Sequence, residues 1–140
     1  MKIYVLILVL ISSFSFSIFS KQKIENRQEI SCQEIEIRHG RLWGNDWHYT
    51  INDQKEFRRI IGGKSKIDFT KYTLLGIVTR TGGCQPPNVT NSVYFNKSKK
   101  LYEYDLSIRQ NGLCKNIFNI ERWCLISKIS EESKIEFKMK

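Results

Sequence analysis

The alternation of apolar and polar residues is clearest in segment 101–110. One face of this segment is apolar and the other polar: Tyr102, Tyr104, Leu106 and Ile108 against Glu103, Asp105, Ser107 and Arg109. Period-two alternation is typical of a strand with one buried face. Segment 92–96 fits as the antiparallel partner, with 97–100 as the turn. The pattern therefore predicts a β-hairpin that buries its apolar face.

Further strands are expected at 30–37, 47–51, 72–80, 120–129 and 134–139. In the first of them the apolar residues change parity after Cys32, which predicts a bulge or a break into two short segments. Gly76 predicts a bulge or a close contact. The last strand is expected to face inward with three residues: Ile135, Phe137 and Met139.

Three other segments are expected to lie outside strands. The polar residues 21–29 predict a loose arm, and the Gly- and Pro-containing residues 81–91 predict a loop. Asn111-Gly112 is expected to end the hairpin strand.

One helix is predicted, beginning after Asp53. Glu56 follows the cap by three residues, as in a capping box. Phe57, Ile60 and Ile61 then share one helical face, and Gly62-Gly63 provide a C-terminal stop. About two turns of helix need a sheet to pack against. The sequence thus predicts an α+β fold: a single β-rich domain of about six or seven mostly antiparallel strands with one short helix.

Residues 1–20 have the pattern of a secretory signal peptide. Lys2 precedes an apolar run from residue 3 to 11, and Ser17 and Ser20 are suitable for cleavage after either of them. The alternative is a membrane anchor, but the continuous run is about half of the ~20 residues that span a bilayer. We therefore expect no stable membrane anchor, a secreted or periplasmic location, and a single domain over residues 21–140.

Four cysteines follow the leader, at 32, 84, 114 and 124. An even number in an exported chain predicts two disulfides, with three possible connectivities. Cys84 and Cys114 both lie near glycines where strands meet loops, whereas Cys32 and Cys124 lie inside predicted strands near the two ends of the exported domain. We expect the pairs Cys84–Cys114 and Cys32–Cys124. A structural zinc site is the alternative, but there is no C-x₂-C pair and no histidine at ligand spacing, so no metal or other cofactor is expected.

The net charge of +9 would ordinarily suggest nucleic acid or a membrane surface as a partner. However, the chain has no alanine and is rich in Ile, Lys and Asn, which indicates a genome-wide bias. The basic stretches 64–66 and 97–100 fit solvated turns. We therefore expect no nucleic-acid partner.

The landmarks from the helix onward resemble the C-terminal domain of the PrcB-like family, small exported bacterial proteins named after a component of a protease complex. The residues that carry the resemblance lie within about 50–130: Asp68-Phe69-Thr70-Lys71, Gly76, Thr81-Gly82-Gly83, Gly112 and Lys128-Ile129. The resemblance implies a non-enzymatic accessory or binding domain, associated in the founding case with stabilising a protease complex. The chain departs from the pattern at Cys84 and Cys114, which leaves the partner open.

Candidate binding residues cluster in the segment 43–49. Trp43, Trp47 and Tyr49 stand around a Gly-Asn-Asp loop, where exposed aromatic rings can stack on a sugar or anchor a protein. The alternative is that both tryptophans fill a core short of large residues, with Trp43 better suited to the surface.

A ribonuclease site would need two titrating groups at a phosphate, with His39 and His48 beside Lys55 or Arg58 as the candidates. Asp68 is expected to cap a turn. No G-x-S-x-G, P-loop or H-E-x-x-H motif is present. We therefore expect that the protein is not an enzyme. We expect a domain that recognises a protein partner, such as a protease or an envelope complex. A carbohydrate-binding module and a small secreted ribonuclease are the alternatives.

Overall fold

The computed structural model describes residues 26–37, 47–62 and 65–140. This part of the chain forms one sheet of six strands, all pairs but one antiparallel, and one short helix. In chain order the elements are β1 (Arg27–Ile30), β2 (Gln33–Glu34), β3 (Trp47–Ile51), α2 (Gln54–Ile60), β4 (Tyr72–Asn96), β5 (Leu101–Ser127) and β6 (Lys134–Met139). The predicted β-rich α+β class is confirmed.

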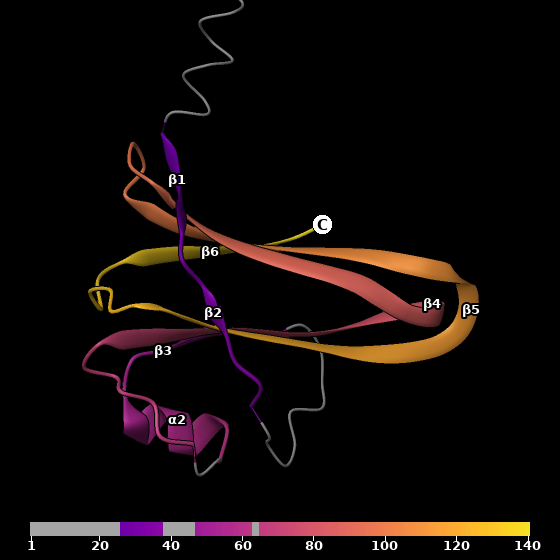
Figure 1. The fold of residues 1–140 in the computed structure, drawn as a ribbon, viewed down its shortest axis with the longest axis horizontal. Coiled ribbons are helices and arrows are strands. Elements are labelled where there is room, and N and C mark those ends of the chain that lie inside the picture. The colour runs from indigo at the N-terminus through magenta and orange to yellow at the C-terminus, as the bar shows by residue number, and fades with distance from the viewer. Residues whose placement is uncertain (1–25, 38–46, 63–64) are drawn as a thin grey trace, which may run out of the picture.

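Two long strands, β4 and β5, dominate the fold and form one continuous hairpin that bends back on itself (Figure 1). The bend divides the sheet into two facing layers. The helix layer contains β3, the first part of β4, the last part of β5, and β2. The outer layer contains β1, the last part of β4, the first part of β5, and β6, which runs parallel to β5.

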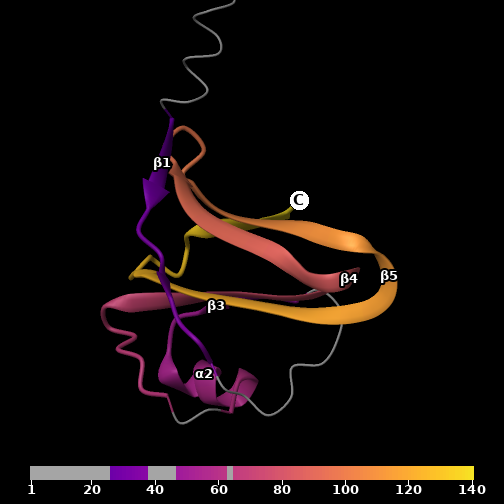
Figure 2. The same cartoon turned by 45° about the vertical axis from the view of Figure 1, so that its right-hand side comes forward.

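The main core lies between the two layers. Its buried side chains come from both arms of the bent hairpin, among them Leu75, Ile77, Val93, Tyr104, Leu106 and Ile126. A second core lies between the helix layer and α2, which Figure 2 shows on the opposite side of that layer from the first core. The alternation of Tyr104 and Leu106 with Glu103 thus places the apolar residues on the core face and Glu103 on the opposite face of the outer layer, as the pattern predicts.

The predicted helix is confirmed, with its cap. Asp53 has an extended backbone, and its carboxylate accepts a hydrogen bond from the Glu56 amide at 2.8 Å. Phe57 is fully buried and Ile61 nearly so. Gly62 has φ +71°, the left-handed conformation that ends a helix at the lowest cost for glycine.

The predicted loop over 81–91 is wrong, because β4 continues through it, and Asn111-Gly112 does not end β5. The register shifts repeatedly between Gly82 and Asn88. The last shift, between Gln85 and Asn88, skips Pro86 and Pro87, so their missing N–H groups are not needed in the ladder. Glycine and proline therefore mark bulges of a bent strand here.

The N-terminal segment also differs from the prediction in part. Residues 27–29, expected within a loose arm, belong to β1, because their backbone pairs with the end of β4. The expected strand 30–37 is broken into two short segments around Cys32, which confirms the parity argument. Of the three inward residues predicted for β6, Ile135 and Phe137 pack on the core, whereas Met139 is exposed.

Two disulfides join distant parts of the sheet. Cys32 pairs with Cys124, and Cys84 with Cys114, which are the two pairs expected from the sequence. The first links the segment between β1 and β2 to β5, and the second crosses the bend of the hairpin. Disulfides are typical of proteins in oxidising compartments. The predicted signal peptide lies outside the described residues.

Candidate functional site

An aromatic row, formed by Trp47, Tyr49 and Trp123, runs from the core to the surface of the helix layer. Alternation along β3 puts Trp47 and Tyr49 on the same face as the buried Ile51. The rings of Trp47 and Tyr49 are stacked with centroids 6.4 Å apart, and those of Tyr49 and Trp123 with centroids 5.5 Å apart. Trp123 is 3% exposed and Trp47 is 53% exposed. The buried end of the row thus supports its exposed end.

A glycine makes this row possible. Gly76 lies directly across from both Tyr49 and Trp123 in the sheet. A Cβ at Gly76 would stand 2.1 Å from the Trp123 ring, so only glycine leaves room for the indole. The sequence prediction of a close contact at Gly76 is confirmed.

A groove of about 330 Å³ adjoins the buried end of the row. Three carboxylates, one guanidinium and apolar side chains line it: Glu34, Glu36, Glu121, Arg122, Ile35, Ile37 and Trp123. Burial raises the pKa of the Tyr49 phenol, and the charge of Glu121 raises it further. The phenol therefore stays protonated and able to donate a hydrogen bond throughout the physiological range.

The structure divides the sequence-predicted binding residues. Trp47 and Tyr49 are in the row, whereas Trp43 lies outside the described residues. Trp47 does not fill the core, and the buried tryptophan among the described residues is Trp123, which sequence reasoning did not single out. The feature that marks Trp123 is the small residue Gly76 directly opposite it, and this pairing can be recognised only once the register of β4 and β5 is known.

The residues suggested for a ribonuclease do not come together in the described structure. His48 alternates to the face away from α2, and its ring stacks on Phe137 of β6 with centroids 4.8 Å apart. Lys55 and Arg58 lie on α2, across the helix layer from His48. His39 lies outside the described residues.

Asp68 has a structural role in a turn. Its carboxylate accepts hydrogen bonds from the amide and the hydroxyl of Thr70, and these bonds lower the pKa of Asp68. The turn caps the entry into β4, as expected from the sequence.

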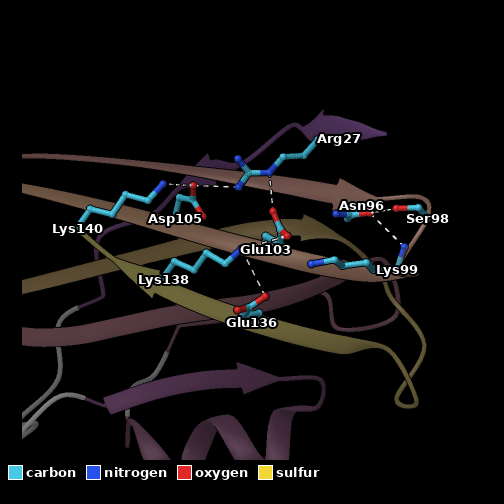
Figure 3. Close-up of polar contacts among 9 residues, drawn as sticks. All are labelled: Arg27, Asn96, Ser98, Lys99, Glu103, Asp105, Glu136, Lys138 and Lys140. Atoms are coloured by element: carbon cyan, nitrogen blue, oxygen red, sulfur yellow. Dashed lines mark hydrogen bonds and ion pairs between the residues drawn. The ribbon is translucent and has the colours of Figure 1, made fainter. Parts of the chain in front are cut away.

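A charged cluster covers the outer layer on the face away from the core (Figure 3). Its members are Arg27, Glu103, Asp105, Glu136, Lys138 and Lys140. Arg27 bridges two carboxylates, with Nε 2.5 Å from Glu103 and Nη2 2.9 Å from Asp105. Lys138 Nζ lies 3.1 Å from Glu103, and Lys140 Nζ lies 3.0 Å from Asp105. Each of these two carboxylates is therefore shared by two cations.

The cluster joins three strands, because Arg27 comes from β1, Glu103 and Asp105 from β5, and Glu136 and Lys138 from β6. The guanidinium of Arg27 also lies 3.9 Å from the centroid of the Tyr94 ring. A groove of about 420 Å³ is lined by four cluster residues, by Asn96 at the end of β4, and by Ser98 and Lys99 of the hairpin turn, among others. Sequence reasoning missed Arg27, since a polar arm shows no strand pattern.

The ionisation of Glu103 and Asp105 depends on this pairing. Burial alone would raise the pKa of Glu103, but the hydrogen bond from Lys138 and the charge of Arg27 outweigh it and lower the pKa. Burial alone would likewise raise the pKa of Asp105, but the hydrogen bonds from Arg27 and Lys140 outweigh it and lower the pKa. Groups with a lowered folded pKa stabilise the fold above their unfolded pKa, and that stabilisation is lost as the pH falls through the folded pKa.

We expect Glu103→Gln to lower the free energy of unfolding by about 2 kcal/mol at neutral pH, the range for hydrogen bonds to charged groups. The variant should also lose less stability than the wild type when the pH falls below about 4, the usual range of Glu. Urea unfolding across pH measures both effects. Glu136→Gln is the matched control, because that side chain is 49% exposed and should change stability little. Equal losses in the two variants would contradict the role of burial.

No protein-family model matches the chain, and no curated protein or solved structure matches it either. The resemblance to the PrcB-like family stays a prediction, carried by the residues quoted for it.

Within the described residues, no group of three or more His, Cys, Asp or Glu side chains is arranged to hold a metal ion. Nor does the described part of the chain contain a helix long and apolar enough to cross a bilayer.

Proposed function

We propose that this protein is an exported, non-enzymatic binding domain that recognises a protein partner through the aromatic row. The observation that carries the proposal is Trp47, 53% exposed and backed by a half-buried and then a buried aromatic ring. Tryptophan and tyrosine dominate the energetics of protein interfaces. A ring held by stacked neighbours loses little conformational entropy on binding.

Three further features support the proposal. The two disulfides and the signal-peptide pattern of residues 1–20 agree with a secreted or periplasmic protein. The carboxylates beside the row, with Glu121 close enough to act on Tyr49, favour a partner surface that carries basic side chains. The PrcB-like resemblance suggests a protease complex as the partner class.

The same exposed ring supports a second candidate, a carbohydrate-binding module. A sugar face can stack on Trp47, and the carboxylates of the groove can accept hydrogen bonds from hydroxyl groups. The two candidates differ in whether the ligand that depends on Trp47 is a protein or a glycan.

We expect Trp47→Ala to weaken binding of the partner by at least tenfold, as for a hot-spot residue. The test is chemical cross-linking of the exported protein in its native envelope or medium, followed by measured affinity for the captured protein. Tyr72→Ala is the matched control, because this aromatic side chain is 37% exposed and lies outside the row.

Capture that Trp47→Ala abolishes and Tyr72→Ala leaves unchanged supports the protein-binding proposal. Glycan-array binding with the same dependence supports the carbohydrate-binding alternative instead. Capture of no protein, or capture equally strong with Trp47→Ala, overturns the proposed role of the row.

A further inference from the structure

The bend of the β4–β5 hairpin is the most exposed apolar part of the described structure. It lies at the end of the molecule away from α2 and from the turn at 97–100 (Figures 1 and 2). Leu113 is 98% exposed and Ile117 is 69% exposed, more than any other large hydrophobic residue in the described ranges. Two aliphatic side chains thus project into solvent from one bend.

The charge carried by the segments of the bend has one sign. Residues 79–91 and 106–120 contain no Asp or Glu, but they contain three cations: Arg80, Arg109 and Lys115. Arg109 and Lys115 are exposed. The charged cluster, by contrast, holds cations and carboxylates together. These stretches of the two arms therefore carry net positive charge, and the residues that bound them in β5 are Asp105 and Glu121.

The bend is also held in shape. The Cys84–Cys114 disulfide crosses it, with Cα atoms 4.6 Å apart. Gly112 has φ +78°, and a Cβ there would meet the Cys84 sulfur at 2.5 Å. The Asn111 side chain donates a hydrogen bond to the Pro86 carbonyl at 2.8 Å. Leu113 is therefore presented on a preorganised backbone, which reduces the entropy lost on docking.

We propose that this bend docks on an anionic lipid surface, with Leu113 and Ile117 entering the boundary between headgroups and acyl chains. Exposed aliphatic side chains flanked by Lys and Arg are the combination that binds at such an interface. Each cation near an anionic bilayer strengthens binding about fivefold. A protein pocket fits less well, because leucine is under-represented among interface hot spots.

The contact is peripheral and reversible, since two side chains do not anchor a protein as a spanning helix does. It goes beyond the proposed function, because it uses the bend and not the aromatic row.

The test is co-sedimentation of the exported protein with phosphatidylcholine vesicles that do or do not contain phosphatidylglycerol. Mass spectrometry first establishes that the leader is absent, because an apolar leader would bind vesicles by itself. We expect binding to the vesicles with phosphatidylglycerol, weaker binding to pure phosphatidylcholine, and weakening by salt.

Leu113→Asp should reduce binding roughly tenfold, because it removes an inserted apolar side chain and adds a charge of the same sign as the lipid. Lys115→Ala should reduce it about fivefold. Both side chains are exposed, so folding should be unaffected, which thermal unfolding checks. Lys55→Ala, an exposed lysine of α2, is the matched control and should bind like the wild type.

Absence of binding to either kind of vesicle overturns the proposal. Equal binding by Leu113→Asp, or an equal loss in Lys55→Ala, overturns it as well, since lipid would then contact another surface or respond only to net charge. If Leu113→Asp abolishes capture of a protein partner and leaves vesicle binding unchanged, the bend is a protein-binding surface and the lipid proposal is wrong.

Discussion

Replacing Cys32 and Cys124 together by alanine is expected to lower the free energy of unfolding by about 4–5 kcal/mol, from the loop-entropy relation. The two residues are 92 positions apart in sequence, so their bond removes much freedom from the unfolded chain. It also links the segment between β1 and β2 to β5, and Cys124 is fully buried. Since a domain of this size has a net stability of about 5–15 kcal/mol, this loss would be severe.

The bond across the bend gives a matched comparison. Cys84 and Cys114 are 30 positions apart and both exposed, so their double alanine variant should lose about 3–4 kcal/mol. Guanidinium unfolding of the two variants measures the difference. A larger loss for the Cys84–Cys114 variant would contradict the ranking by loop length and burial.

Gly76→Ala is expected to lower the free energy of unfolding by about 3 kcal/mol, which is the upper part of the range for overpacking a core. The added Cβ would stand 2.1 Å from the Trp123 ring, which is buried and stacked on Tyr49. The indole cannot keep its place, so Gly76→Ala should also disturb the aromatic row. Chemical unfolding gives the loss of stability, and tryptophan fluorescence reports the displaced ring.

Gly82→Ala is the control in the same strand. Its Cβ would have no neighbour nearer than 3.8 Å, which is ordinary contact. Alanine there should leave stability unchanged or raise it by up to about 1 kcal/mol, because it restricts the unfolded chain. If Gly76→Ala were equally harmless, the close packing of Trp123 on the sheet would be refuted.

Local features of the fold could be predicted from local sequence. The Asp53 cap, the Phe57 face and the Gly62 stop lie within ten residues of one another and specify α2 by hydrogen bonding and periodicity alone. The turn at 97–100 follows in the same way from the alternation on either side of it. The break between β1 and β2 is visible as a change of parity after Cys32.

Features that depend on partners far along the chain could not be predicted in this way. Gly83 and Pro86 read as a loop, but the opposing strand supplies pairing on both sides of the bulges, so β4 continues. Arg27 reads as part of a polar arm until β1 pairs with β4 and Glu103 comes within 2.5 Å. The contacts that order β1 are made with residues more than sixty positions away in sequence. Those that order the bulged part of β4 are made with β5 across the bend.

The candidate surfaces show the same division. Trp47 and Tyr49 were recognisable as candidates because aromatic residues beside a polar loop are chemically conspicuous. Their support by Trp123 depends on register, and the exposure of Leu113 and Ile117 depends on the fold of the hairpin.

The sequence by itself thus determined the β-rich class, the helix with its cap and the faces of the hairpin strand, because period and capping are short-range properties of the chain. The tertiary structure decided where the long strands bend, which tryptophan is buried and where the charges gather. Those outcomes depend on cross-strand register, which pairs residues by their position in space and not by their distance in sequence.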